Sequence, residues 1–262
     1  MDSLNKNRRT GAKSPLWSKF ASFSKRFLYL MAAFIAAMTL AACIEIPADP
    51  DDGGGDNGGD NGGGVSGKRI KTMVHSSGDG PVRFEYSYNS DGTTKQVDSY
   101  DSASKLVMRD VITCNPDGTW NKLEQTDLAY SGTVLILNHT YDANKKPLSI
   151  NGKTYLGGSE IGTTTFSFTF QNGRKVSQKQ TVTAMGVLAQ EISSEFLYDA
   201  NGRRTKTTST PRVGEKVVYT RTAYNSDGTL KTITVSGGQS FTISFTWEEG
   251  KSTVNMDDIW GW

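Results

Sequence analysis

The chain has 262 residues, of which 35% are hydrophobic and 21% are charged, and its formal net charge at pH 7 is +2. From Lys68 to the end the sequence carries 22 basic and 20 acidic residues, so this part is close to neutral. Nucleic-acid binding needs a basic face, and this balance excludes nucleic acid as a partner of the body of the chain.

Residues 1–42 have the features of a signal peptide. A basic stretch ends at Lys25 and Arg26, and an uncharged run, FLYLMAAFIAAMTLAA, follows from Phe27 to Ala42. This run of about 16 residues matches the apolar region of a signal peptide and is short of the roughly 20 residues that span a bilayer. Cleavage after Ala42 is therefore favoured over the alternative, an uncleaved transmembrane anchor.

The apolar run ends in Leu40-Ala41-Ala42-Cys43, which resembles the lipobox of bacterial lipoproteins. The resemblance implies that the thiol of Cys43 is lipidated and that the chain is cut just before it, so that the membrane is a partner through this lipid. The acidic stretch that follows, CIEIPADPDD, resembles an export signal of lipoproteins of the Bacteroidota. We therefore expect a lipid-anchored protein of the outer membrane that faces the periplasm or lies at the cell surface.

Residues 43–67 form a predicted tether. Most of it, DPDDGGGDNGGDNGGGVSG, is rich in Gly, Asp and Asn and has almost no apolar side chain to bury, which predicts disorder. The density of Asp and Asn suggests calcium loops, but the spacing fits neither an EF-hand nor a glycine-rich nonapeptide. We interpret this segment as a flexible spacer and predict no metal site.

The segment 68–254 repeats one pattern about every 26 residues, which indicates a repeat architecture. Its turn segments are NSDG after Tyr88, NPDG after Cys114, DANK after Tyr141, QNG after Phe170, DANG after Tyr198, NSDG after Tyr224 and EEG after Trp247. Turns rich in Asn and Asp that end in Gly predict β-hairpins, because these residues accept a positive φ. The glycines assigned to this structural role are Gly92, Gly118, Gly173, Gly202, Gly228 and Gly250. In the third unit Lys145 replaces the glycine, so we expect a looser hairpin there, or Asn144 in the left-handed conformation.

The strand before each turn alternates apolar and polar residues. Phe84 and Tyr86 face one way while Arg83 and Glu85 face the other, and no convincing amphipathic helix is available to cover the aromatic face. The predicted fold is therefore all-β: an antiparallel meander of about seven β-hairpin repeats, or about fourteen strands, curled into a barrel, half-barrel or sandwich. The tail, residues 255–262, is expected to cap an open end with its tryptophans.

The segment Tyr198-Asp199-Ala200-Asn201-Gly202-Arg203 resembles the core of a YD repeat, the unit of Rhs-type proteins. The resemblance covers nearly all of the segment 68–254 and is strongest over 196–206. Similar degenerate repeats occur in lipoproteins of the Bacteroidota that have no known function. Rhs proteins use dozens of repeats to enclose a toxin, and seven are too few for such a shell.

The residues that could carry catalysis have simpler explanations. His139 lies in register with the aromatic positions and is expected to be a core residue, and Cys114 occupies the aromatic position of its own repeat. Paired carboxylates among the turn residues Asp91, Asp117, Asp142, Asp199 and Asp227 could hydrolyse glycosides, but hairpin chemistry already accounts for them. We predict no catalytic residue and no cofactor.

The expected function is that of a non-catalytic, lipid-anchored binding or scaffold lipoprotein, with a protein or a glycan as partner. The alternative is a carrier of lipid or another hydrophobic ligand within the curved sheet. The residues predicted to line such a ligand site are Phe84, Tyr86, Phe168, Phe196 and Trp247. A third reading is an enzyme that acts on cell-wall glycans.

Overall fold

The computed structural model describes residues 67–77, 80–129, 132–200, 202–238 and 240–250. Cys43, the signal peptide, residues 43–66 of the tether and the tail 255–262 lie outside the described residues. Within the described ranges there are fourteen strands and no helix long and apolar enough to cross a membrane. The strands are β1 (Lys68–His75), β2 (Arg83–Tyr88), β3 (Thr94–Tyr100), β4 (Leu106–Cys114), β5 (Trp120–Asp127), β6 (Val134–Tyr141), β7 (Pro147–Leu156), β8 (Ser159–Gln171), β9 (Arg174–Ala184), β10 (Val187–Tyr198), β11 (Arg204–Pro211), β12 (Val217–Tyr224), β13 (Leu230–Ser236) and β14 (Phe241–Glu249).

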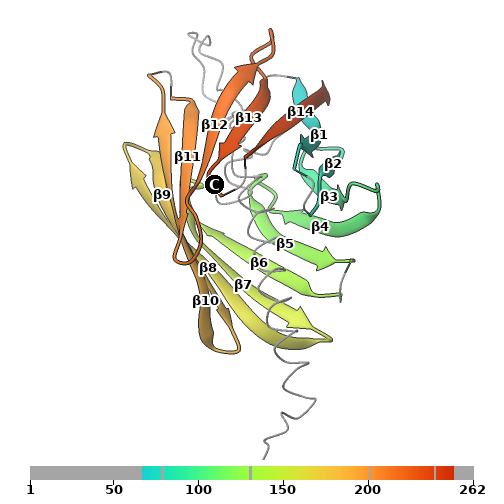
Figure 1. Cartoon of the computed structure of the whole chain (residues 1–262), viewed down its shortest axis with the longest axis vertical. Helices are drawn as coiled ribbons and strands as arrows, with labels where there is room; N and C mark the ends of the chain where they lie inside the picture. Colours follow the sequence, from blue (N-terminus) through green and yellow to red (C-terminus); the bar gives the residue numbers. More distant parts are fainter. Residues whose placement is uncertain (1–66, 78–79, 130–131, 201, 239, 251–262) are drawn as a thin grey trace, which may run out of the picture. The chain divides into compact units, whose positions relative to one another are not determined.

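The strands form one closed antiparallel barrel in which each strand pairs with its neighbours along the chain (Figure 1). β14 pairs with β1 and so closes the ring. This confirms the predicted all-β antiparallel meander. The sequence left open a barrel, a half-barrel or a sandwich, and the structure is a barrel. A closed ring leaves no sheet edge exposed, which removes the template for pairing with another chain.

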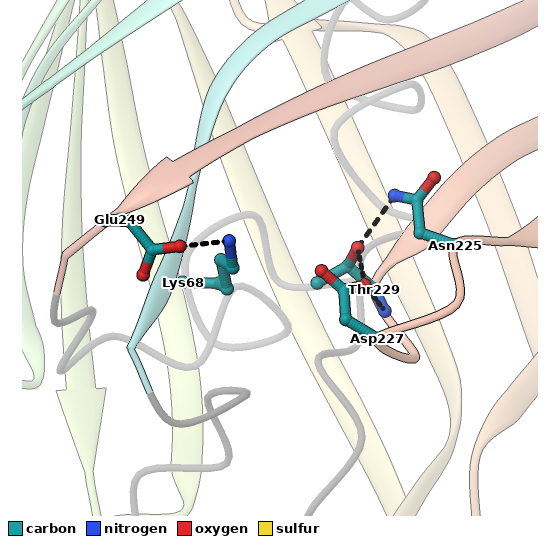
Figure 2. Close-up of polar contacts among 5 residues, drawn as sticks. All are labelled: Lys68, Asn225, Asp227, Thr229 and Glu249. Carbon is teal, nitrogen blue, oxygen red and sulfur yellow. Dashed lines mark hydrogen bonds and ion pairs between the residues drawn. The ribbon is translucent and has the colours of Figure 1, made fainter.

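The Asn-x-Asp-Gly-Thr turns share one hydrogen-bond network. In the β12–β13 turn the Asn225 amide donates to Oγ1 of Thr229 at 2.7 Å, and this hydroxyl donates to Oδ1 of Asp227 at 2.6 Å (Figure 2). The backbone N–H of Thr229 donates to the same carboxylate oxygen at 3.0 Å. The same contacts recur at Asn89–Thr93 and Asn115–Thr119, so each turn is stabilised by its own side chains.

The β6–β7 turn, which lacks the glycine, is as tightly closed as the others. The backbone N–H of Lys145 donates to the carbonyl of Asp142 at 3.1 Å. In the β2–β3 turn, the N–H of Gly92 donates to the carbonyl of Asn89 at the same distance. Lys145 itself has a φ of 61°, so the predictions of a looser hairpin and of Asn144 as the left-handed residue are wrong. The Asp142 carboxylate accepts from the N–H groups of Asn144 and Lys146 at 2.8 and 2.9 Å, and these bonds hold the loop in this conformation.

The barrel is closed by a seam between β14 and β1. β14 pairs with β13 along one edge and with β1 along the other. The seam carries an ion pair between Lys68 and Glu249 (Figure 2) and another between Arg69 and Glu248 at 2.8 Å. This pairing satisfies backbone groups of both terminal strands. The strand that the sequence pattern predicts after the EEG turn lies outside the described residues.

Aromatic side chains just before the turns tie neighbouring hairpins together. The hydroxyl of Tyr88 donates to the carbonyl of Ile70 on β1 at 2.7 Å, and that of Tyr198 donates to the carbonyl of Lys175 on β9 at 2.8 Å. The indole of Trp247 makes the equivalent bond to Leu230 on β13 at 2.8 Å. The repeated aromatic position therefore has a structural role, since it joins each of these hairpins to the strand before it.

Candidate functional site

The barrel interior is the candidate site, because the strands turn most of their apolar side chains inward. Buried and exposed residues alternate along each strand, as on β4, where Met108, Asp110 and Ile112 are buried and Val111 is exposed. The interior is largely apolar along the β13–β14–β1–β2 wall and along the β6–β7–β8 wall. Its buried apolar residues on these walls are Leu230, Ile233, Val235, Ile243, Phe245, Ile70, Met73, Phe84, Tyr86, Leu135, Leu137, Ile150 and Phe166.

Buried polar side chains interrupt this interior on β9, β10 and β11. We call Gln178, Gln180, Ser194, Thr207 and Ser209 the amide patch; all five are buried. Their strand pairings make them neighbours, since Gln178 lies opposite Ser194, and Ser194 lies opposite Ser209 with the two hydroxyls 2.9 Å apart. The amide patch therefore spans three adjacent strands on one side of the interior.

The two glutamines of the amide patch lack partners in the described part of the chain. Gln178 is 3% exposed and Gln180 is 0% exposed, yet neither end of either side-chain amide makes a hydrogen bond there. The Thr207 hydroxyl is likewise buried without a partner. A buried amide or hydroxyl that makes no hydrogen bond costs about 1–3 kcal/mol, so this concentration of such groups is unfavourable for the protein alone.

A second polar group lies on β3–β5. We call Ser99, Asp110 and Gln125 the carboxyl patch; all three are buried, and Asp110 lies opposite Gln125 in the β4–β5 pairing. Burial raises the pKa of Asp110 to about 7, and a hydrogen bond with the Gln125 side chain opposes the rise. Oδ1 of Asp110 and Oε1 of Gln125 are buried and make no hydrogen bond to the described residues.

The two patches lie on different walls of the ring, the carboxyl patch on β3–β5 and the amide patch on β9–β11. Asp110 is five residues from Asn115, where its turn begins, and Gln178 is five residues from Gly173, where its turn ends. Both turns are at the same end of the barrel, because antiparallel strands alternate in direction. Along the ring, β6, β7 and β8 separate the two patches on one side, and β12, β13, β14, β1 and β2 separate them on the other.

His75 and His139 are buried in the barrel, where they pack against aromatic side chains. His75 packs against Phe84 with ring centroids 4.9 Å apart, and His139 packs against Trp120 at 5.7 Å. Burial lowers the pKa of each histidine to about 4, and the charge of Lys175 adds to the effect at His139. Both rings are therefore neutral at pH 7, and the prediction that His139 packs in the core is confirmed.

Two buried cationic side chains, Lys175 and Arg204, lie near the Phe196 ring, close to the turns that precede β9 and β11. Nζ of Lys175 is 5.4 Å from the centre of the Phe196 ring, and the Arg204 guanidinium is 4.4 Å from it. Arg204 also donates to the Tyr198 hydroxyl at 3.4 Å. Positive charge is thus present at the turn end of the β9–β11 wall, next to the amide patch but not within it.

The five residues predicted to line a ligand site all face inward. Phe84, Tyr86 and Phe196 are buried, while Phe168 and Trp247 are partly exposed. Phe168 lies beside Gln178 in the β8–β9 pairing, so one predicted residue borders the amide patch. Sequence reasoning missed the glutamines themselves. The sequence does contain a sign of their burial: the two glutamines are two residues apart and, in an alternating strand, fall on the same face as Val182, which points inward.

The turn residues singled out in the sequence serve the hairpins, apart from Gly250, which follows β14 at the seam of the barrel. The φ angles of the assigned glycines are positive, at 87° for Gly92, 84° for Gly118, 81° for Gly173, 85° for Gly202, 84° for Gly228 and 153° for Gly250. Hydrogen bonds from Thr93, Thr119 and Thr229 lower the pKa values of Asp91, Asp117 and Asp227 respectively. Carboxylates held ionised in this way are poor general acids for glycoside hydrolysis.

Within the described ranges, Cys114 and the other metal-ligating residue types form no recognisable site. Burial raises the pKa of the Cys114 thiol, which makes it a poor nucleophile at neutral pH. Among the described residues, no group of three or more His, Cys, Asp and Glu side chains is placed to hold a metal ion.

The outer wall of the barrel is polar. It carries ion pairs between Arg109 and Asp98 at 2.7 Å and between Lys122 and Glu124 at 2.8 Å, and threonine ladders such as Thr163–Thr183. Exposed large apolar side chains are scattered over the surface, and on the strands they include Val74, Val111, Leu148 and Leu197. Along the strands, the exposed face is thus mainly polar, and most of the large apolar side chains are buried.

Comparison with known proteins finds likenesses among solved structures, two of which are porin-like proteins from Bacteroides species. A porin-like protein from Bacteroides vulgatus has a TM-score of 0.47 and 9% identity, over 68% of this chain and 98% of that one. A porin-like protein from Bacteroides uniformis has a TM-score of 0.42 and 13% identity, over 70% of this chain and 96% of that one. No family model and no curated protein matches the chain. At these identities and TM-scores, the two likenesses assign no function to it.

Proposed function

We propose that the chain is a non-catalytic, lipid-anchored binding protein that holds a small molecule inside its barrel. The observation that carries the proposal is the set of unpartnered polar groups in the interior, above all the amides of Gln178 and Gln180. Roughly nine tenths or more of buried polar groups in folded proteins are hydrogen-bonded, so unpartnered buried amides are unusual. A small molecule bound in the interior would account for them.

The anchor and the location belong to the same proposal. Lipid on Cys43 would hold the protein at the outer membrane, on its periplasmic side or at the cell surface, and acyl chains contribute about 0.8 kcal/mol per buried CH₂. The polar outer wall suits a barrel that faces water beside the membrane. The repeats are proposed to be degenerate YD repeats, on the strength of Tyr198, Asp199 and the recurrent turns.

The second candidate is a carrier of lipid or another hydrophobic molecule. It is favoured by the continuous apolar wall from β13 to β2, which a long acyl chain could contact along its length. An apolar ligand would leave the amide patch and the carboxyl patch without partners, which makes this candidate the weaker one. A scaffold role would instead use the polar outer wall and its loops, with a protein or a glycan as partner.

The test is to identify what the barrel contains. The lipoprotein is purified from membranes, unfolded by heat, and the released small molecules are identified by mass spectrometry. A binding protein releases one species in near-stoichiometric amount, and the double variant Gln178→Leu/Gln180→Leu carries less of it. The control is Gln96→Leu, which changes a glutamine bonded to Asp98 on the outer wall and leaves the yield unchanged. Release of nothing but water from the wild type would refute the proposal.

A further inference from the structure

The six turns at one end of the barrel differ in charge. β1 begins and β14 ends at this end, so the turns that follow β2, β4, β6, β8, β10 and β12 all lie there, and we call it the turn end. The turns after β2, β4 and β12 read NSDGT, NPDGT and NSDGT, and each carries one acidic and no basic residue. The turns after β6, β8 and β10 read DANKK, QNGRK and DANGRR, and together they carry six basic and two acidic residues. Strands β6 to β11 are consecutive in the ring, so the three basic turns lie side by side.

Contacts between neighbouring turns hold the basic side chains in one row. Nζ of Lys146 lies 5.0 Å from the centre of the Phe170 ring, just before the next turn. The Arg174 guanidinium lies 5.8 Å from the centre of the Tyr198 ring, just before the turn after that. Arg203 makes the same kind of contact, at 5.6 Å, with the aromatic residue before the β12–β13 turn. Each of these cations is therefore positioned by the aromatic residue of the following hairpin.

Four of the six basic side chains are accessible to solvent. Lys145 and Arg174 are exposed, and Lys146 and Arg203 are half-buried. We call these four residues the basic turn face. Arg203 is paired with Asp199 at 3.0 Å, whereas the other three form no ion pair with a carboxylate of the described residues. Three accessible positive charges on adjacent turns are thus available to an anionic partner.

Two exposed leucines lie beside the basic turn face. Leu148 on β7 is two residues after Lys146, and Leu197 on β10 is two residues before Asp199. Their exposed fractions are 58% and 57%. The large apolar residues that flank the acidic turns are instead buried or half-buried, namely Tyr88, Trp120, Tyr224 and Leu230. Exposed cations and exposed leucines therefore occur together on the same half of the turn end.

The N-terminal segment joins the barrel at the turn end. β1 begins there, where Lys68 pairs with Glu249 (Figure 2). Between Cys43 and Lys68 there are 24 residues, and a chain of that length spans at most about 80 Å. Lipid on Cys43 would therefore keep the turn end close to the bilayer that holds the lipid.

We propose that the basic turn face docks on the anionic headgroups of this bilayer, while Leu148 and Leu197 enter the interfacial layer beneath them. A bilayer offers negative charge above an apolar phase, which suits both kinds of side chain. A soluble polyanion, or the acidic turns of a second copy of the chain, would bind the charges and leave the leucines in water. The three acidic turns tilt away from the bilayer, because an anionic surface repels them. This inference rests on the lipid anchor of the proposed function and is independent of what the interior holds.

The test is co-sedimentation of the mature chain with lipid vesicles. The chain from residue 43 onward carries Cys43→Ser, so it has no acyl chains and reports the affinity of the barrel itself. The probes are vesicles of phosphatidylcholine and vesicles of phosphatidylcholine and phosphatidylglycerol in equal parts. The chain should bind the anionic vesicles and not the neutral ones. Binding should be lost at about 1 M salt, where the screening length is about 3 Å.

The basic variant is Lys145→Gln/Lys146→Gln/Arg174→Gln. Each Lys or Arg near an anionic surface raises the affinity about fivefold, so this variant should bind about a hundredfold more weakly. Its matched control removes three basic residues from exposed loops at the opposite end of the barrel and should bind as the unchanged chain does. The control is Lys105→Gln/Arg212→Gln/Lys216→Gln.

A second variant, Leu148→Gln/Leu197→Gln, changes no charge and only exposed side chains. It should bind about tenfold more weakly, because it cannot bury apolar surface in the interfacial layer. This variant also keeps the inference testable if the basic variant fails to fold.

The remaining outcomes separate this inference from the proposed function. No binding to anionic vesicles, or equal losses in the basic variant and its matched control, would overturn the inference and leave the proposed function standing. Binding that appears only after the acidic residues of 43–67 are neutralised would mean that this segment covers the face, which also overturns it. A dimer that forms without vesicles and is abolished in the basic variant would assign the face to a second copy instead. Mass spectrometry of the protein purified from membranes tests the lipid on Cys43 separately.

Discussion

Replacing Asp110 with asparagine should stabilise the barrel, and the gain should grow with pH. Asp110 is buried on β4 beside Gln125, and burial raises its pKa from 3.8 to about 7. Asparagine has the same shape and cannot ionise. Its NH₂ group can also donate to Oε1 of Gln125, which has no partner among the described residues.

The magnitude follows from the pKa shift of Asp110. The unfolded chain loses the proton near pH 3.8 and the folded chain near pH 7, so ionisation costs the folded state stability between these two values. Below pH 4 both states are protonated and the wild type loses nothing. Above pH 7 the loss is complete, and a shift of about 3 units at 1.36 kcal/mol per unit corresponds to about 4 kcal/mol.

Urea denaturation of the wild type and of Asp110→Asn at pH 4, 5.5, 7 and 8.5 measures this difference. The buried histidines shift the stability of both proteins alike, so subtracting the two curves isolates Asp110. The control is Asp98→Asn on the outer wall, which removes an exposed ion pair with Arg109 and should change stability by less than about 1 kcal/mol. A difference between the wild type and Asp110→Asn that stays flat from pH 4 to pH 8.5 would show that Asp110 is not buried as described.

Three further changes test the histidines and the hairpins. In His139→Phe, the acid-unfolding midpoint should fall to lower pH, because the wild-type ring has a pKa of about 4 when folded and 6.5 when unfolded and so loses stability as pH drops from 6.5 to 4; an unchanged midpoint contradicts this. In Gly202→Val, a β-branched residue takes a φ of 85° and its Cβ would clash with the guanidinium of Arg174, so unfolding should become easier by about 1–3 kcal/mol, seen as a lower melting temperature. In Tyr198→Phe, loss of the bond to Lys175 should lower the free energy of unfolding by about 1 kcal/mol in urea titrations, and no change would mean that the bond is dispensable.

The local structure of the repeats was readable from the sequence because it depends on neighbouring residues. An Asn-x-Asp-Gly-Thr turn makes its hydrogen bonds within five residues, as Asn225, Asp227 and Thr229 do, and the alternation of Phe84 and Tyr86 with Arg83 and Glu85 marks the inward face of a strand. Both patterns can be recognised without any knowledge of the rest of the chain. The all-β class, the antiparallel meander and the inward aromatic residues follow from them.

The closure of the sheet and the composition of its interior depend on contacts between distant residues. The ring is completed by the pairing of β14 with β1, in which Lys68 lies opposite Glu249, 181 positions away in the sequence. The sequence around Asp110 and Gln180 does not mark either residue as buried, and only the closed barrel removes them from water. Local hydrogen-bond chemistry thus determined the hairpins, and the tertiary structure decided which polar groups are buried, because burial depends on strands far apart in the chain.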